Sequence, residues 1–190
     1  QEGFRNAYDK DISVVRRGPI KCGKLTNPSA EIKSIWDLSK VKRTPAEWAL
    51  RWVLNHEEVS LLLSGMTTLE QVKENIETVS TATPNSLTEE EIQLIDRVTE
   101  IYKQKIRVGC TGCEYCLPCE VDVNIPYIFQ IYNDLHVFGT EENSKRIYKS
   151  YMEKEKDASR CIECGKCESL CPQGLEIRDY LKEAHLALAK

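Results

Sequence analysis

The sequence lacks long apolar runs and has no excess of basic residues. Its apolar runs are short, Leu61-Leu62-Leu63 among them, whereas a membrane span needs roughly 20 consecutive apolar residues. The 26 lysines and arginines are outnumbered by 30 aspartates and glutamates, which leaves no electrostatic footprint for nucleic acid or an anionic membrane. No signal region opens the chain. We therefore expect a cytoplasmic protein with no membrane or nucleic-acid partner.

Histidine is also scarce, which limits the metal chemistry available outside the cysteines. The three histidines, His56, His136 and His185, have no ligand-spaced partner, so we expect them to be caps, surface residues or core residues. The length of 190 residues suits one medium-sized domain or two small ones. The first residue is Gln1 and not methionine, which indicates a processed chain or a piece of something longer.

Cysteine has the most informative distribution in the chain. Eight of the nine cysteines fall within residues 110–119 and 161–171, and Cys22 stands alone. A disulfide framework would spread its cysteines through a small secreted domain, so this clustering indicates metal binding. The candidate ligands are Cys110, Cys113, Cys116 and Cys119 in the first run, and Cys161, Cys164, Cys167 and Cys171 in the second.

The second cysteine run has the spacing of a bacterial ferredoxin loop, CxxCxxCxxxCP, which binds a [4Fe-4S] cluster. Three thiolates from one tight loop grip three corners of a cubane, and a fourth must arrive from another direction. The first run departs from this pattern, because its last gap is one residue shorter and Glu120 stands where proline is expected. Eight cysteines still match two clusters.

The two runs belong to an internal repeat. The first three cysteines recur 51 residues later, and Cys119 and Ile125 recur 52 residues later as Cys171 and Ile177. In two-cluster ferredoxins the fourth cysteine of each run binds the other cluster. Carried onto this chain, that arrangement gives the ligand sets Cys110, Cys113, Cys116 and Cys171, and Cys161, Cys164, Cys167 and Cys119.

Structural zinc is the main alternative for these thiolates, because zinc also takes four cysteines. Zinc sites usually offer two separated CxxC pairs, whereas each run here offers four ligands at ferredoxin spacing. The spacing therefore favours iron-sulfur clusters over zinc.

The first half of the chain predicts a βαβα unit. Residues 12–15 form a β-branched run, and residues 59–63 are apolar without alternation, as in a strand covered on both faces. Between them, Thr44, Pro45 and Glu47 form the capping box of a helix. Thr68 and Gln71 repeat this cap before a helix with Leu69, Val72, Ile76 and Val79 at helical spacing.

The rest of the chain predicts helices and no strand. Residues 81–86 break the pattern as a connector, and Thr88 with Glu91 caps the helix that follows. Further helices are expected from Pro126 to Gly139, over about 141–155, and from near Glu176.

Several segments resemble an aldo/keto reductase. Residues 44–54, 59–65 and 69–75 look like the last part of that family's barrel, and residues 19–25 are similar to the loop after its seventh strand. The cysteine-rich tail resembles the ferredoxin-like extension of the family's iron-sulfur branch. The resemblance implies an α/β fold followed by an all-α one: the last βαβα portion of a TIM-type (β/α)8 barrel plus an α-helical ferredoxin domain with two cluster loops.

The resemblance also implies a domain division and cofactor residues. We expect the end of the barrel in residues 1–85, a connecting helix in 86–108, and the ferredoxin-like domain in 109–190. The family's catalytic Asp, Tyr, Lys and His lie on earlier strands, so no catalytic residue is assigned. Gly65 and Gln71 replace the cations that clamp a 2′-phosphate in the family. The expected nucleotide-binding residues are Ser64, Gly65, Glu74 and Asn75.

The function that this resemblance implies is that of an iron-sulfur oxidoreductase. Its tail would carry two [4Fe-4S] clusters and transfer electrons to or from a barrel active site that uses NAD(P)H or flavin. Its partner would be a redox protein or a small-molecule carbonyl substrate. Two alternatives remain: a non-catalytic electron-transfer or redox-sensing module, and a zinc-stapled structural domain.

Overall fold

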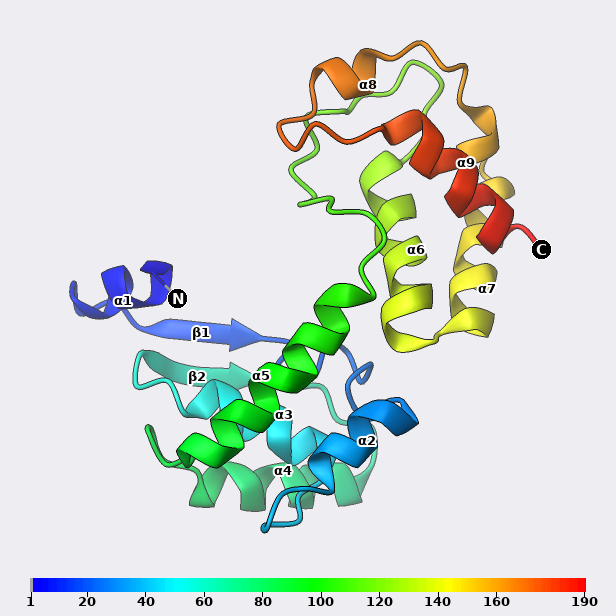
Figure 1. The fold of residues 1–190 in the computed structure, drawn as a ribbon. Helices are drawn as coiled ribbons and strands as arrows, with labels where there is room; N and C mark the ends of the chain where they lie inside the picture. Colours follow the sequence, from blue (N-terminus) through cyan, green and yellow to red (C-terminus); the bar gives the residue numbers. More distant parts are fainter. Residues whose placement is uncertain (1) are drawn as a thin grey trace. The chain divides into compact units, whose positions relative to one another are not determined.

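The computed structural model describes residues 2–190, which divide into two compact units, one ending at Ile101 and the other beginning at Tyr102 (Figure 1). The division falls within one helix, α5, so the expected boundaries at residues 85 and 108 stay a prediction. The elements are α1 (Glu2–Tyr8), β1 (Val14–Arg17), α2 (Ala30–Trp36), α3 (Pro45–Leu54), β2 (Val59–Leu63), α4 (Leu69–Thr81), α5 (Glu89–Gln104), α6 (Ile125–Phe138), α7 (Glu141–Met152), the 3-10 turn η1 (Ala158–Arg160), α8 (Lys166–Ser169) and α9 (Ile177–Leu188).

The two strands of the first unit pair in parallel, as a βαβ unit requires. Val15 lies opposite Leu61 and Arg17 opposite Leu63, with an irregularity after Val14. The expectation that β2 is covered on both faces is wrong for this unit, because Leu61 and Leu63 are exposed. A sheet of two strands has too few neighbours to bury them.

The capping residues place the helices of the first unit as predicted. The Thr44 hydroxyl accepts the Glu47 N–H at the start of α3, and the Thr68 hydroxyl accepts the Gln71 N–H at the start of α4. Thr88 and Glu91 hydrogen-bond each other's backbone N–H, which completes the capping box of α5. Helices α1 and α2 were not predicted.

A stacked tryptophan pair anchors the small core of the first unit. The rings of Trp36 and Trp48 are 4.6 Å apart and nearly parallel, and Leu87 and Ile95 pack in the same cluster. The Arg43 guanidinium lies over the Trp48 ring and forms an ion pair with the buried Glu91. These contacts join α2, α3 and α5.

Helix α4 buries its polar face and exposes most of its apolar stripe. Asn75 and Thr78 are buried, and α4 packs against α3. Leu69, Ile76 and Val79 are exposed. Exposed apolar residues on β2 and α4 are compatible with a portion of a barrel, whose elements bury such faces against neighbouring strands and helices.

The second unit has a larger core made by three packed helices, α6, α7 and α9 (Figure 1). Ile128, Phe129, Tyr148 and Ala184 are fully buried in it. Helix α6 ends at Gly139, whose φ of 64° lies in the left-handed region that favours glycine. The predicted absence of strands from this half is confirmed for the residues that the structure describes. Over residues 2–190, no helix has both the length and the apolar character that crossing a membrane requires.

Replacing Thr44 with alanine is expected to destabilise the first unit by about 1–2 kcal/mol. The variant loses the hydroxyl that caps α3 and that also donates a hydrogen bond to Glu74 on α4. Thermal denaturation followed by circular dichroism measures the effect. Thr44→Ser keeps the hydroxyl and should behave nearly as the wild type; equal losses in both variants would contradict the capping role.

Candidate metal centres

The first cysteine loop, residues 109–124, forms a cavity together with the second run's last cysteine. Cys110, Cys113, Cys116 and Cys171 line this cavity. Its apolar wall is made by Ile125, Phe129, Leu175 and Ile177, which belong to or pack against the core of the second unit.

The second loop forms a separate cavity with the last cysteine of the first run. Cys119, Cys161, Cys164 and Cys167 line it, and Cys116 also reaches it. Cys116 thus lines both cavities. If Cys116 is assigned to the first cavity, each cavity has four cysteines. The structure brings together all eight predicted cysteines in two groups that exchange their fourth members.

The backbone of the two loops repeats the same turn around the second cysteine of each run. Gly112 and Glu114 flank Cys113 with φ of 70° and 65°, and Glu163 and Gly165 flank Cys164 with φ of 56° and 76°. Glycine occupies the left-handed position before Cys113 and the one after Cys164, so neither loop has glycine at both. Turns of this kind gather backbone N–H groups into a concave surface that suits an anion.

The helices that follow the two cysteine runs begin with different residues at equivalent positions. At the start of α9, the Glu168 carboxylate accepts the Arg178 N–H at 2.9 Å and its guanidinium Nε at 2.9 Å. At the corresponding position of α6 stands Pro126, which has no N–H to satisfy. Glu168 therefore ties the second loop to α9, whereas Pro126 leaves no donor to satisfy at the equivalent position of α6.

Burial makes the inner thiols poor thiolates unless a cation is present. It raises the pKa of the Cys116 thiol to about 11, with Cys110, Cys167 and Cys113 adding to the shift. Burial also raises the pKa of Cys167. Thiolates at these positions need positive charge beside them, and iron supplies it. These two cysteines are therefore neutral thiols when no cation is bound, and a bound cation would hold them as thiolates.

The cysteines differ in exposure in the same way in both loops. Cys113 and Cys164 are exposed, whereas the other six cysteines of the two runs are half-buried against the core. Each loop thus presents its second cysteine to solvent. A Lys166–Glu120 ion pair joins the two loops at the surface.

No disulfide accounts for these cysteines. All nine are free thiols, with Cys22 exposed and remote in sequence from the two runs. Among residues 2–190, no group of three or more His, Cys, Asp or Glu side chains is placed to hold a metal ion. The eight cysteines instead line the walls of two cavities.

The residues predicted to bind a nucleotide are only partly brought together. The Asn75 side chain donates to the Ser64 hydroxyl at 3.5 Å, whereas Glu74 accepts a hydrogen bond from Thr44. Gly65 is exposed in the turn after β2. The Gln71 side chain accepts the Thr67 N–H at 2.8 Å, so it serves the cap of α4. The assignment of a nucleotide to these residues stays a prediction.

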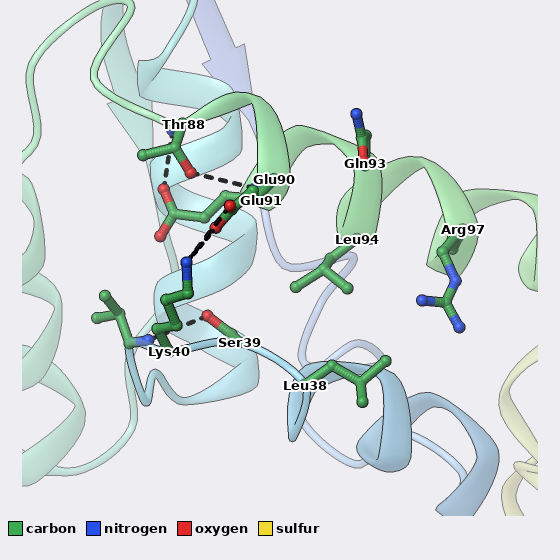
Figure 2. A pocket seen from close by; sticks show the side chains of 10 residues that line it. Leu38, Ser39, Lys40, Thr88, Glu90, Glu91, Gln93, Leu94 and Arg97 are labelled. Carbon is green, nitrogen blue, oxygen red and sulfur yellow. Dashed lines mark hydrogen bonds and ion pairs between the residues drawn. The ribbon is translucent and has the colours of Figure 1, made fainter.

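A shallow pocket in the first unit contains none of the predicted site residues (Figure 2). Figure 2 shows Lys40 directed toward Glu90, and its Nζ lies 3.0 Å from a Glu90 carboxylate oxygen. Glu91 accepts from Thr88 on the same side. Lys40 and Glu90 thus pair with each other, and Glu91 serves the capping box of α5, so these three charged groups are engaged within the protein.

Sequence reasoning missed the polar side chains that hold the chain ahead of each cysteine run. Asn133 and Tyr148 hydrogen-bond backbone groups near residues 108 and 158, and Asp157 is buried beside Tyr148's partner His185. These residues lie on or near predicted helices, and no spacing in the sequence links them to the cysteines. The three-dimensional contacts alone identify them.

Two known protein families match successive segments of the chain. The sequence model of the Aldo/keto reductase family matches residues 4–100, and that of the 4Fe-4S dicluster domain matches residues 109–175. No curated protein and no solved structure gives a significant match. The second match covers all eight clustered cysteines. The chain therefore belongs to the aldo/keto reductase family, and it is an iron-sulfur member of these oxidoreductases with a 4Fe-4S dicluster domain after its reductase portion.

Proposed function

We propose that the second unit holds two [4Fe-4S] clusters by exchanged ligation. Four cysteines line each cavity once Cys116 is assigned to the first, which supports this division. The observation that carries the proposal is the placement of Cys171 in the first cavity and of Cys119 in the second. The proposed ligands are Cys110, Cys113, Cys116 and Cys171 for one cluster, and Cys119, Cys161, Cys164 and Cys167 for the other.

The surrounding residues have definite tasks in this proposal. The thiolates would hold the irons, and the left-handed turns around Cys113 and Cys164 would offer backbone N–H groups to the negative charge of the cluster. Phe129 and Ile125 keep water from the inner side of the first cavity. A bound [4Fe-4S] cluster supplies reversible one-electron transfer. The exposed second cysteine of each loop gives each site an approach from solvent.

Zinc is the less favourable occupant of the same thiolates. A structural zinc ion needs four ligands at one point, with Zn–S bonds of about 2.3 Å. Each run instead offers its cysteines at ferredoxin spacing, and residues 109–175 match the 4Fe-4S dicluster domain. Both observations favour a [4Fe-4S] cluster over zinc.

We further propose that the clusters pass electrons between a redox partner and the active site of the complete barrel. NAD(P)H or flavin would act there, with Ser64, Gly65, Glu74 and Asn75 as the nucleotide-binding residues of this chain. The Asn75–Ser64 hydrogen bond at the carboxyl end of β2 supports a role for those two residues. A reducing compartment such as the cytoplasm suits nine free thiols.

Purification without oxygen tests the cluster proposal. We expect about eight irons and eight sulfides per chain, with an absorption near about 400 nm that dithionite bleaches. A colourless protein that contains stoichiometric zinc would contradict the proposal. An assay of the complete protein with carbonyl substrates then tests the barrel reaction separately from cluster content.

A further inference from the structure

The backbone just before the first cysteine run is fixed by one side chain of α6. Asn133 Oδ1 accepts the N–H of Arg107 at 2.9 Å and that of Val108 at 3.0 Å. Its Nδ2 donates to the Val108 carbonyl at 2.8 Å. The Val108 side chain is 1 % exposed, so its backbone cannot turn to water without withdrawing that side chain from the core.

The backbone just before the second run is fixed in the same place by different residues. The Tyr148 hydroxyl on α7 accepts the Ala158 N–H at 3.1 Å and lies 2.8 Å from His185 Nδ1. Asp157 Oδ1 accepts the Ser159 N–H at 2.9 Å. Burial raises the pKa of Tyr148 to about 12, so the hydroxyl keeps the proton that it can donate to His185.

The two anchored pairs of amides are equivalent positions of the repeat. Ala158 and Ser159 follow Arg107 and Val108 by 51 residues, the offset that also relates the first three cysteines of the runs. In each half the anchored N–H groups lie three and two residues before the first cysteine. Asn133 thus holds both amides of the first half, whereas Tyr148 and Asp157 each hold one of the two in the second half. A comparison of the two repeats by sequence does not reveal this equivalence.

We propose that Asn133 and Tyr148 are positioning residues, each holding one cysteine loop in its cluster-binding form. The proposal rests on the cluster sites proposed above. Asn133 acts on the loop of Cys110, Cys113 and Cys116, and Tyr148 acts on the loop of Cys161, Cys164 and Cys167. Because each anchor serves one loop, loss of one anchor affects one cluster and not the other.

Asn133→Ala and Tyr148→Phe, made in the full chain and purified without oxygen, test this assignment. A chelator is added together with iodoacetamide, and iron release and the alkylation of each cysteine are followed with time. In Asn133→Ala, we expect the cysteines of the first ligand set to become alkylated about tenfold faster, with the second set unchanged. Tyr148→Phe should show the reverse, and the reduced protein should show one altered electron paramagnetic resonance signal in each case.

Two further variants separate positioning from general loss of stability. Asn133→Asp keeps the acceptor for both amides and should lose less protection than Asn133→Ala. Tyr180→Phe removes a hydroxyl of α9 outside the anchor and should leave both clusters as in the wild type. Equal acceleration of both ligand sets, or no acceleration in either variant, would overturn the assignment.

The anchors can also be tested without any cluster. Amide hydrogen exchange at Arg107 and Val108 should quicken in Asn133→Ala, and exchange at Ala158 should quicken in Tyr148→Phe. If the wild type contains no iron, the proposed function fails, while this exchange measurement still decides the role of the anchors. Unchanged exchange at these amides would overturn the proposal whatever the metal content.

Discussion

Replacing Cys171 with alanine is expected to expose the first cysteine loop and spare the second. Cys171 is the fourth cysteine of the first cavity although it belongs to the second run. Under a chelator, the iron content of the variant should fall from about eight to about four atoms per chain. Alkylation of Cys110, Cys113 and Cys116 should accompany the loss, while Cys161, Cys164 and Cys167 stay protected.

The same experiment discriminates between exchanged and unexchanged ligation. If each run bound its own cluster, Cys171→Ala would release Cys161, Cys164 and Cys167 instead, which would contradict the proposed ligand sets. Cys119→Ala is the reciprocal variant and should release the second loop. Cys22→Ala is the matched control, because Cys22 is exposed and lies outside both cavities.

Much of the fold follows from residues that act over a few positions. Thr44 and Thr68 fix the starts of α3 and α4 through contacts three residues along the chain. Gly139 ends α6 because its backbone turns into the left-handed region. Cysteine spacing is equally local, since three of the cysteines that line each cavity come from one short loop. These features can be predicted from the sequence because the interacting residues lie within a few positions of one another.

The features that escaped prediction depend on contacts between distant segments. The exposed stripe of α4 has the spacing of a buried face, and the spacing alone does not say whether a neighbour covers it. Asn133 contacts a segment 25 residues before it, and Tyr148 contacts His185 37 residues after it. Asparagine and tyrosine within helices have many roles, so neither residue type indicates an anchor.

The predicted nucleotide residues illustrate a similar limit. Glu74 and Asn75 are neighbours in sequence but face different partners, Thr44 and Ser64. Consecutive residues of a helix point about 100° apart, so one of them can face the end of a strand while the other contacts an adjacent helix. The Glu-Asn motif of the family predicts that both residues lie at the nucleotide site. In this structure only Asn75 contacts the carboxyl end of β2.

Replacing Phe129 with alanine is expected to produce the largest loss of stability in the second unit. The side chain is fully buried in the core, contacts the Tyr180 ring edge to face, and lines the first cavity. Large-to-small changes of this kind cost about 3–5 kcal/mol, because lost contacts add to the cost of an unfilled space. Urea denaturation without oxygen, followed by circular dichroism, measures the loss.

The position of Phe129 gives this variant a second, more specific consequence. Its ring separates the core from the first cavity, so a smaller side chain admits water to that cavity before the other. The first cluster should therefore bleach sooner than the second when air is admitted. Phe129→Leu keeps most of the volume and should show a smaller change in both measurements, while Tyr115→Ala removes an exposed ring of the same loop and should leave stability nearly unchanged. Equal bleaching of both clusters in Phe129→Ala would show that the core, and not this ring alone, shields the first site.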